Sequence, residues 1–485
     1  MPSPEPTTIA VGSTTTVRPA PPAGPDSALR PGALLVLALG SLGVFVVFLD
    51  TTIVNIAFPT ISRGFHTTTA GLSWVLNAYS LVFAAMLIPA GRLADRYGRK
   101  RTFLIGLVGF AIMSALCGIA PDTGVLIASR AFQAVFSALV VPTSLALILP
   151  EFPAHRRHIA VGTWGTMSAA AAALGPTIGA LLTEYASWRW VFLVNVPICA
   201  IIVVLGLRAL TESRDPDAEG IPDPLGTVLI AGIPALLSFA IIEGPGWGWA
   251  DARVITAFAL AALLLPTFIL RSRRARRPVM NLALFANRQF SLVSIANLLF
   301  STAFYGMLLG NVIFLQTEWH YPVLRAALAA IATPLVVTAV SRASTALAAR
   351  IGYRTVMLAG GICWAVGSGA LAIVLGTSPH WLTGWLPWAI LLGLGIGLTL
   401  PVQASAAVEP LPPAQYGVGS AINASFRQLG AVLGISIFVA VLGNGGIDGF
   451  RHAWWVFAAL GIASGLVVQF TRRSRARQGI PVTTT

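Results

Sequence analysis

The feature that most constrains this chain is a succession of long apolar runs with almost no charged residues inside them. A helix that crosses a bilayer needs roughly 20 mostly apolar residues. Fourteen runs have about that length or more, so lipid is the expected solvent. They lie at 33–57, 72–92, 101–120, 124–149, 158–183, 189–209, 225–243, 253–271, 288–316, 323–345, 354–376, 384–405, 418–442 and 451–471.

The composition excludes a water-soluble fold. Of the 485 residues, 56% are hydrophobic and 10% are charged, whereas a soluble domain has about 25% charged residues. Backbone polar groups must be paired within lipid, so only helices and closed barrels span it. The runs are continuous and lack the alternation of barrel strands. The predicted fold class is therefore an all-α polytopic membrane protein with fourteen transmembrane helices.

The basic residues indicate the orientation. An even number of helices places both termini on the same side, and cytoplasmic loops of membrane proteins are enriched in Lys and Arg. With a cytoplasmic N-terminus, the only basic residues in outside segments are Arg63, Arg189, Arg253, Arg325 and Arg451. We therefore expect a multi-pass plasma-membrane protein with cytoplasmic ends.

The two ends of the chain are expected to be tails. Residues 1–30 are rich in Pro, Ser and Thr and contain no apolar stretch of the kind found in a signal peptide. This composition is typical of a disordered segment. We predict a disordered cytoplasmic tail at 1–30 and a second cytoplasmic tail at 472–485.

Several function classes are not supported by any motif. The net charge of +14 is distributed over short loops, which disfavours nucleic-acid binding. The three cysteines, Cys117, Cys199 and Cys363, lie within apolar runs and lack metal-ligand spacing. No phosphate-binding loop, zinc motif or serine-nucleophile elbow occurs, and Lys100 is the single lysine. We expect a protein that is not an enzyme and uses no ATP, metal or cofactor.

An internal repeat divides the chain. Residues 91–100 (GRLADRYGRK) align with 345–354 (TALAARIGYR), and a set of glycines aligns at nearly the same offset. The aligned glycines are Gly162, Gly175 and Gly179 with Gly417, Gly430 and Gly434. The offset spans eight helices, which fits two six-helix halves separated by two inserted helices. The predicted boundaries are 31–210, 211–277 for the linker with its two extra helices, and 278–471.

These segments resemble the major facilitator superfamily, and within it the fourteen-helix drug–proton antiporters. GRLADRYGRK is similar to the signature loop of the superfamily. LDTTIVNIAFP (49–59), LIASRAFQAVFSA (126–138), GPTIGA (175–180) and SWRWVFLVNVP (187–197) resemble motifs of helices 1, 4, 5 and 6. Ala134 and Ala180 stand where these motifs usually have glycine, and Ala349 replaces the acidic residue in the second copy of the loop.

Asp50 and Arg130 are the candidate proton-coupling residues. Both lie inside apolar runs, where a charge is costly and marks a functional site by default. A carboxyl group in a wet cavity can exchange protons, and the resemblance implies a coupling role for Arg130. The alternative is a structural hydrogen bond at Asp50 and a structural ion pair at Arg130.

Further polar residues within the runs are candidates for lining a substrate cavity between the halves. Ser420, Asn423 and Arg427 form a polar stripe with helical spacing, although interhelical hydrogen bonding would produce the same pattern. The full candidate set is Asn55, Asn77, Gln133, Tyr305, Asn311, Gln316, Asn423 and Arg427.

Two glycine-containing segments are expected to serve the conformational change. In the signature loop, Gly91 and Gly98 permit a tight turn, and Asp95 either caps the following helix or bonds to the opposite half. Together with Arg96 and Arg99 these residues are read as a latch at the cytoplasmic mouth. Gly175, Pro176 and Gly179 form a kinked, glycine-lined segment that resembles the antiporter motif. We expect it to pack against the other half.

The resulting hypothesis is a monomeric secondary transporter that exchanges protons for small amphipathic compounds, drugs or antibiotics, and exports them. The energy source is the proton gradient, and two conformations with different affinities for proton and substrate suffice. The few acidic residues argue mildly for a neutral or mixed substrate. The alternatives are a dedicated exporter of one endogenous metabolite, a proton-coupled uptake symporter, and a membrane sensor or channel.

Overall fold

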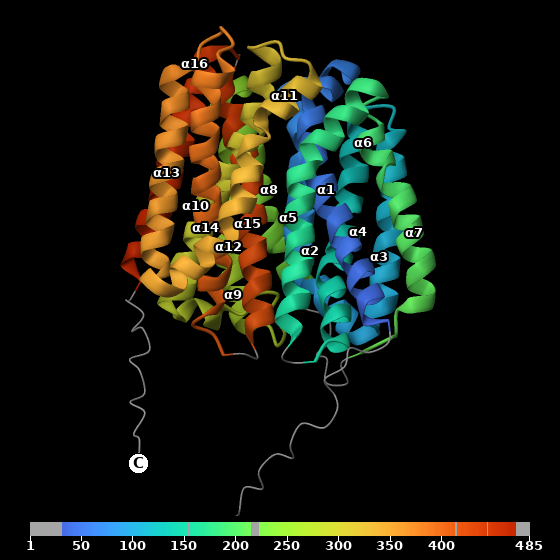
Figure 1. The fold of residues 1–485 in the computed structure, drawn as a ribbon. Helices are drawn as coiled ribbons and strands as arrows, with labels where there is room; N and C mark the ends of the chain where they lie inside the picture. Colours follow the sequence, from blue (N-terminus) through green and yellow to red (C-terminus); the bar gives the residue numbers. More distant parts are fainter. Residues whose placement is uncertain (1–31, 154–155, 215–222, 413–414, 444, 472–485) are drawn as a thin grey trace, which may run out of the picture.

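A computed structural model describes residues 32–153, 156–214, 223–412, 415–443 and 445–471. The predicted tails, 1–30 and 472–485, lie outside these ranges. Within them every regular element is a helix, and 14 helical segments are long and apolar enough to cross a membrane (Figure 1). The all-α polytopic fold class is confirmed.

The first six spans form the N-terminal half. They are α1 (Ala33–Phe65), α2 (Thr69–Tyr97), α3 (Arg99–Gly118), α4 (Thr123–Ile148), α5 (Arg157–Tyr185) and the pair α6 (Trp190–Leu193) and α7 (Asn195–Ala209). The run predicted as one helix at 189–209 is interrupted at Val194. Pro197 has no N–H to bond the carbonyl of Leu193, four residues earlier, so the helix is interrupted there.

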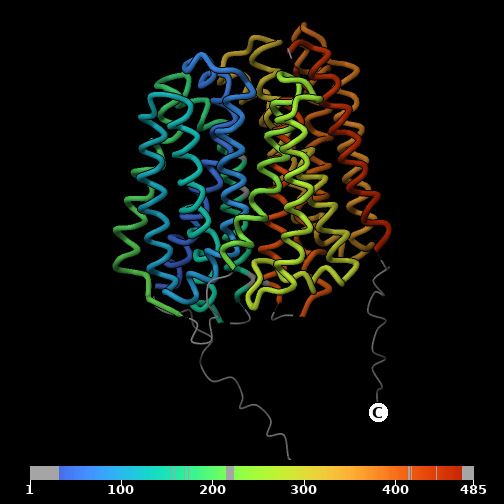
Figure 2. The backbone as a smooth tube through the Cα atoms, turned by 180° about the vertical axis from the view of Figure 1, so that it is seen from behind, coloured from blue at the N-terminus to red at the C-terminus, as the bar shows by residue number. Residues whose placement is uncertain are grey.

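The last six spans form the C-terminal half, which lies beside the first half when seen from behind (Figure 2). They are α10 (Arg288–Thr317), α11 (Val323–Ala330) with α12 (Ala332–Ile351), α13 (Tyr353–Val374), the π-helical turn η4 (Trp381–Trp385) with α14 (Leu386–Val408), α15 (Tyr416–Leu442) and α16 (Ile447–Val467). The break at Ile331 has the same cause as the first, because Pro334 cannot bond the carbonyl of Ala330.

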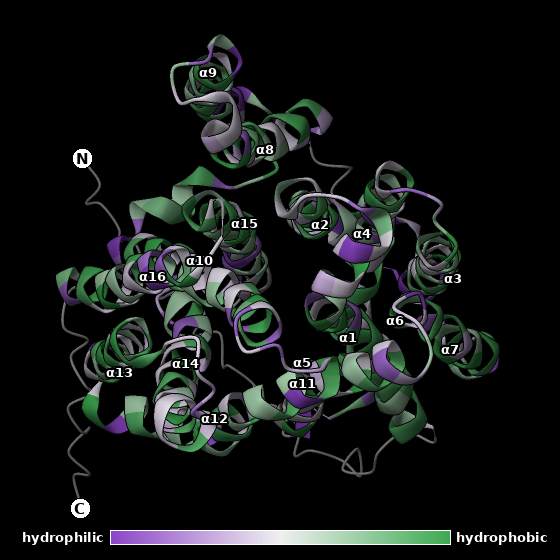
Figure 3. Ribbon diagram, turned by 90° about the horizontal axis from the view of Figure 1, so that it is seen from above, coloured by the Kyte–Doolittle hydropathy of each residue, from purple (hydrophilic) through white to green (hydrophobic). Residues whose placement is uncertain are grey.

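The inserted pair, α8 (Pro224–Trp247) and α9 (Ala252–Arg274), lies outside the two halves beside α2 and α15 (Figure 3). Asp223 accepts a hydrogen bond from the Leu225 amide at the start of α8 and a bidentate pair from Arg271 of α9. The Arg271 hydrogen bonds lower the pKa of the Asp223 carboxyl. This ion pair fixes the two inserted helices to each other at one end.

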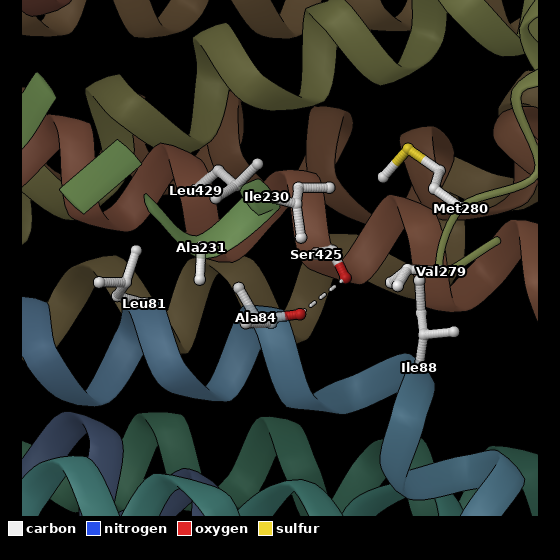
Figure 4. A pocket seen from close by; sticks show the side chains of 10 residues that line it. Leu81, Ala84, Ile88, Ile230, Ala231, Val279, Met280, Ser425 and Leu429 are labelled. Carbon is white, nitrogen blue, oxygen red and sulfur yellow. Dashed lines mark hydrogen bonds between the residues drawn. The ribbon is translucent and has the colours of Figure 1, made fainter. Parts of the chain in front are cut away.

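An apolar pocket marks the junction of the insertion with the halves (Figure 4). Its lining includes Leu81 and Ile88 of α2, Ile230 of α8, Met280, and Leu429 of α15. Ser425 of α15 donates to the Ala84 carbonyl of α2 at 3.2 Å beside it. With so little polarity, this pocket is suited to packing or to a lipid chain rather than to a proton site.

The two copies of the repeated loop share an unusual backbone. Gly98 joins α2 to α3 with φ +116°, and Gly352 joins α12 to α13 with φ +90°. Each donates its amide to a carbonyl four residues earlier, at 2.9 Å. L side chains rarely adopt such positive φ values. The shared geometry supports the internal repeat inferred from the aligned sequences.

We predict that tags placed on residue 1 and residue 485 are accessible only from the cytoplasm. The expectation follows from the even number of spans and from the bias of basic residues toward one set of loops. It is checked by labelling the tags in intact and in permeabilised cells. Labelling of either tag in intact cells would contradict the orientation or the number of spans.

Candidate functional site

The strongest polar cluster surrounds Asp50, at the middle of α1. The carboxylate is fully buried and accepts three hydrogen bonds. Arg130 of α4 donates to Oδ2 at 2.5 Å, while Gln133 of α4 and Asn195 of α7 donate to Oδ1 at 3.1 and 3.0 Å. The predicted charges are thus brought together as one buried ion pair.

Arg130 is held by aromatic rings as well as by the carboxylate. Its guanidinium lies 4.0 Å from the centre of the Tyr79 ring and 5.7 Å from that of Phe192. It also donates to Gln133 Oε1 at 2.7 Å, three residues later on the same face of α4. Cation–π contacts strengthen when water is excluded, and Arg130 is only 1% exposed. The pair is therefore isolated from solvent.

Further hydroxyl and amide groups complete the cluster. Ser114 of α3 accepts hydrogen bonds from Gln133 at 2.7 Å and from Asn195 at 3.2 Å. Tyr79 donates to Ser137 at 2.8 Å, and Ser137 donates to the Gln133 carbonyl. Sequence reasoning did not select Asn195, Ser114 or Tyr79. The available signal was the polar residue Asn195 within the motif at 187–197, directly after the helix break.

The glycines of the predicted antiporter motif lie against α1, next to this cluster. A Cβ atom on Gly175 would lie 2.1 Å from Thr52 Oγ1, and one on Gly179 would lie 2.6 Å from a methyl carbon of Ile56. The two glycines therefore contact α1 of the same half, whereas α5 meets the other half through α11 and α12. The glycines permit close contact of α5 with α1 of the same half, two residues from Asp50.

The signature loop is held by a residue that the motif does not include. Asp95 forms an ion pair with Arg99, one turn later. The first amides of α3, at Lys100 and Arg101, donate instead to the carboxylate of Glu212 at 3.0 and 3.1 Å. Asp95 therefore does not cap α3, and among the described residues its partner is Arg99 of the same half. Glu212 does the capping, beyond the end of α7.

The rest of the predicted latch lies around this turn. Arg96 lies over the Tyr97 ring, 5.4 Å from its centre. A Cβ on Gly98 would meet the Glu212 carboxylate at 2.6 Å, so the turn needs glycine for space as well as for its positive φ. A Cβ on Gly91 would contact only Pro142 of α4, at 3.8 Å.

Two predicted cavity residues connect the halves. Asn77 of α2 donates to Ser436 of α15 at 3.1 Å, and Gln316 of α10 donates to the Ile56 carbonyl of α1 at 3.0 Å. Both contacts lie toward the ends of α10 and α15 that are predicted to be extracellular. These two hydrogen bonds join α2 to α15 and α10 to α1.

Three other candidates bond within their own half. Asn55 donates to the Thr51 carbonyl one turn earlier on α1, at 3.0 Å. Asn311 of α10 accepts from Trp454 of α16 at 3.1 Å, and Gln133 belongs to the Asp50 cluster. Their hydrogen bonds are explained by helix packing or by the ion pair rather than by a cavity.

One group of predicted cavity residues remains, and its side chains form none of the hydrogen bonds described above. It consists of Tyr305, Asn423 and Arg427. The Arg427 Nε and the Asn423 Nδ2 are buried and have no hydrogen-bond partner among the described residues. Arg427 lies close enough to Tyr305 to interact electrostatically with it. The backbone carbonyl of Asn423 is occupied by Asn297, at 2.8 Å. This group is the best candidate for contact with a substrate.

The predicted cytoplasmic halves of α5 and α12 present exposed polar faces. Thr163 and Thr166 of α5 are exposed, as are Thr338, Arg342 and Thr345 of α12. A Cβ on Gly162 would contact nothing within 4 Å. On α12 the opposite face packs on α14, where Val336 and Val340 meet Gly393 and Gly397. The polar faces therefore point away from helix–helix contacts.

Comparison with known proteins gives consistent results. The family model described as Major Facilitator Superfamily matches residues 40–296 and 293–483. The tetracenomycin C resistance and export protein of Streptomyces glaucescens is 31% identical over 89% of this chain and 80% of its own length. The multidrug resistance protein Stp of Mycobacterium tuberculosis is 34% identical over 84% of this chain and 76% of its own length.

A solved structure has the same fold at low sequence identity. The auto-inhibited POT family peptide transporter is 17% identical and superposes with a TM-score of 0.68. The match covers 92% of this chain and 98% of that one. At this identity the likeness concerns the fold alone.

Proposed function

The chain belongs to the major facilitator superfamily, and we propose that it is a proton-coupled antiporter that exports small amphipathic drugs or antibiotics across the plasma membrane. Its curated relatives are resistance and export proteins. The observation that most supports proton coupling is the buried Asp50–Arg130 pair. It joins the only Asp or Glu within α1 to a cation that cannot lose its proton.

The pair has the chemistry of a proton-operated switch. A carboxylate that accepts three hydrogen bonds must give up at least its ionic partner when it is protonated, because a neutral carboxyl no longer compensates the Arg130 charge. An unpaired buried cation is strongly unfavourable, so protonation favours a different arrangement of α1, α4 and α7. Proton binding and the conformation of the half are coupled in this way.

We propose that the arrangement described here is open toward the cytoplasm. The hydrogen bonds of Asn77 and Gln316 join the halves toward the predicted outer ends. The exposed threonines of α5 and α12 lie toward the predicted cytoplasmic ends. In an exporter this is the state that takes up substrate from the cell, with Asp50 ionised and paired.

The proposal has two forms, an exporter of many compounds and an exporter of one compound. The name of one relative specifies a single antibiotic, tetracenomycin C, and that of another specifies multidrug resistance. A dedicated exporter of one endogenous metabolite is therefore the second candidate. A proton-coupled uptake symporter would use the same pair with the opposite flux. We further propose that the protein acts as a monomer, is not an enzyme, and needs no ATP, cofactor or nucleic acid.

Flux in membrane vesicles of known orientation tests the proposal. Inverted vesicles expose the cytoplasmic face, so an acidified lumen should drive tetracenomycin C, or members of an antibiotic panel, into them. Collapse of the proton gradient with a protonophore should stop the accumulation, and vesicles lacking the protein should show none. Accumulation in right-side-out vesicles, driven by acid outside, would instead establish uptake by symport.

A further inference from the structure

The C-terminal half has an unbalanced positive charge inside its spans. The helices α10 through α15 contain no Asp or Glu. Arg427 lies eleven residues after α15 begins at Tyr416, and Arg342 lies nine residues before α12 ends at Ile351. At about 1.5 Å per residue these positions are about 14–17 Å along their helices, near the middle of a core about 30 Å thick.

Neither arginine is neutralised by the described part of the chain. The ion pairs among the described residues involve other arginines, and the buried carboxylate Asp50 is already paired with Arg130. Arginine does not deprotonate in proteins, so these side chains keep their charge. An intramembrane cation without a partner marks a functional site by default.

The position of Arg427 on α15 directs it to the space beside α10. Ser425 and Ser436 bond to α2 on the opposite face of α15, whereas Gly430 and Gly434 pack closely on α10. Helical spacing places Arg427 on the side of these glycines and not on the side of the serines.

Tyr305 contributes to the same space from α10. It lies three turns before Gln316, which donates to α1, so the two share the face of α10 directed at the N-terminal half. Its ring contacts that of Phe304, with centroids 4.9 Å apart. An aromatic surface for an apolar body thus lies next to the cationic group.

The unsatisfied groups here are donors. The Arg427 Nε–H and the Asn423 Nδ2 amide lie one turn apart, and both are buried without an acceptor among the described residues. A buried donor without a partner costs free energy, and a charged donor forms its strongest hydrogen bonds with an anion. Two adjacent donors, one of them charged, are complementary to the two oxygens of an acidic group.

We propose that Arg427 and Asn423 bind the ionised acidic group of the exported compound, a carboxylate or sulfonate, and that the substrates are amphipathic anions. The assignment rests on the proposed exporter function and specifies its substrate class. Arg342, on the exposed polar face of α12 with Thr338 and Thr345, adds positive potential on the predicted cytoplasmic approach. Lipophilic cations are disfavoured by the same charges.

Equilibrium binding to the full-length protein tests this assignment without requiring transport. The protein is placed in nanodiscs of zwitterionic lipid and titrated at pH 7.5 with 1-pyrenebutyrate, 1-pyrenebutanol and 1-pyrenebutylammonium. The three probes share one ring system and differ in charge, and empty nanodiscs correct for partition into lipid. We expect the anion to bind at least about tenfold more tightly than the other two.

Variants test whether the preference for the anionic probe depends on Arg427. Arg427→Gln should bind the three probes with similar affinity, whereas Arg427→Lys should retain part of the preference for the anion. Arg325→Gln is the matched control, because this arginine lies over the Tyr321 ring at the start of α11, away from the group. Each variant is first checked for an unchanged thermal unfolding midpoint. Equal binding of the three probes by the native protein, or an unchanged preference in folded Arg427→Gln, would overturn the proposal.

The outcome is separable from that of the vesicle experiment. Proton-driven export of compounds by a protein that shows no preference for the anionic probe refutes the substrate class and leaves the exporter function standing. A clear preference that depends on Arg427, in a protein that moves no protons, supports the anion site and refutes the antiport.

Discussion

Replacing Asp50 with asparagine is expected to reduce proton-driven transport by at least roughly a hundredfold, the scale on which the loss of a proton-transfer group acts. Asparagine has nearly the same shape but cannot ionise. The structure adds a second reason, because Asp50 is surrounded by the donors of Arg130, Gln133 and Asn195. The amide nitrogen of asparagine is itself a donor, and it would face one of these three donors instead of accepting its hydrogen bond. The measurement is proton flux in inverted vesicles on addition of substrate.

This variant also leaves Arg130 without its counter-ion. Breaking a buried pair by removing one partner costs about 3–5 kcal/mol, so Asp50→Asn is expected to lower the thermal unfolding midpoint. The double variant with Arg130→Gln removes both charges and should recover much of this stability. It should not recover proton coupling, because no ionisable carboxyl is restored. Proton-driven transport by the double variant would exclude Asp50 from the proton path.

A matched control is available in the same half. Asp122 caps α4 by accepting a hydrogen bond from the Val125 amide at 2.9 Å, and asparagine is an equally good capping residue. Asp122→Asn removes the same charge from an exposed position and is expected to transport normally. A loss of transport in this control would show that the effect of Asp50→Asn is not specific to the buried pair.

The spans were accessible to sequence reasoning because lipid imposes a simple rule, whereas their orientation stays a prediction. Each span must be long and apolar, and the fourteen predicted runs all correspond to helical spans. The interruptions at Val194 and Ile331 were not predicted, although each follows from a proline a few residues later. A hydropathy window averages over such breaks, since the residues on both sides are equally apolar.

The residues of the polar cluster around Asp50 were predicted only in part. Asp50, Arg130 and Gln133 are conspicuous as polar residues in apolar runs, and the two on α4 share a face. Ser114 and Asn195 come from other helices, and no spacing rule relates residues across a bundle. Serine and asparagine are also common in membrane helices for packing reasons, so their presence alone did not indicate the site.

The capping of α3 by Glu212 shows a similar limit. The signature loop offered Asp95 as the local acid, but Gly98 turns the chain so that Asp95 bonds to Arg99. The first amides of α3 are then capped from more than a hundred residues away in the sequence. Local sequence indicates which groups need a partner, whereas the tertiary fold decides which residue supplies it.

Replacing Gly175 with leucine is expected to reduce transport by more than about tenfold. A Cβ at this position would lie 2.1 Å from Thr52 Oγ1 and 3.0 Å from Thr52 Cβ. Threonine is β-branched and stiff, so α5 and α1 must separate. Overpacking a close contact costs about 1–3 kcal/mol, and every 1.4 kcal/mol is about a factor of ten in an equilibrium. Because Asp50 is two residues from Thr52, the displacement of α1 reaches the polar cluster around Asp50.

The same helix provides the control for this prediction. A Cβ on Gly165 meets nothing within 4 Å, and helical spacing places Gly165 away from the exposed threonines of α5, so Gly165→Leu adds the same side chain to α5 without a clash and should transport normally. A size rescue tests the named contact, because Gly175→Ala should impair transport and Thr52→Ala should partly restore it by removing the clashing hydroxyl. The measurements are proton-driven uptake into inverted vesicles and the thermal unfolding midpoint. Normal transport by Gly175→Leu would show that the close approach of α5 to α1 is not required for coupling, and a failed rescue would place the defect elsewhere on α5.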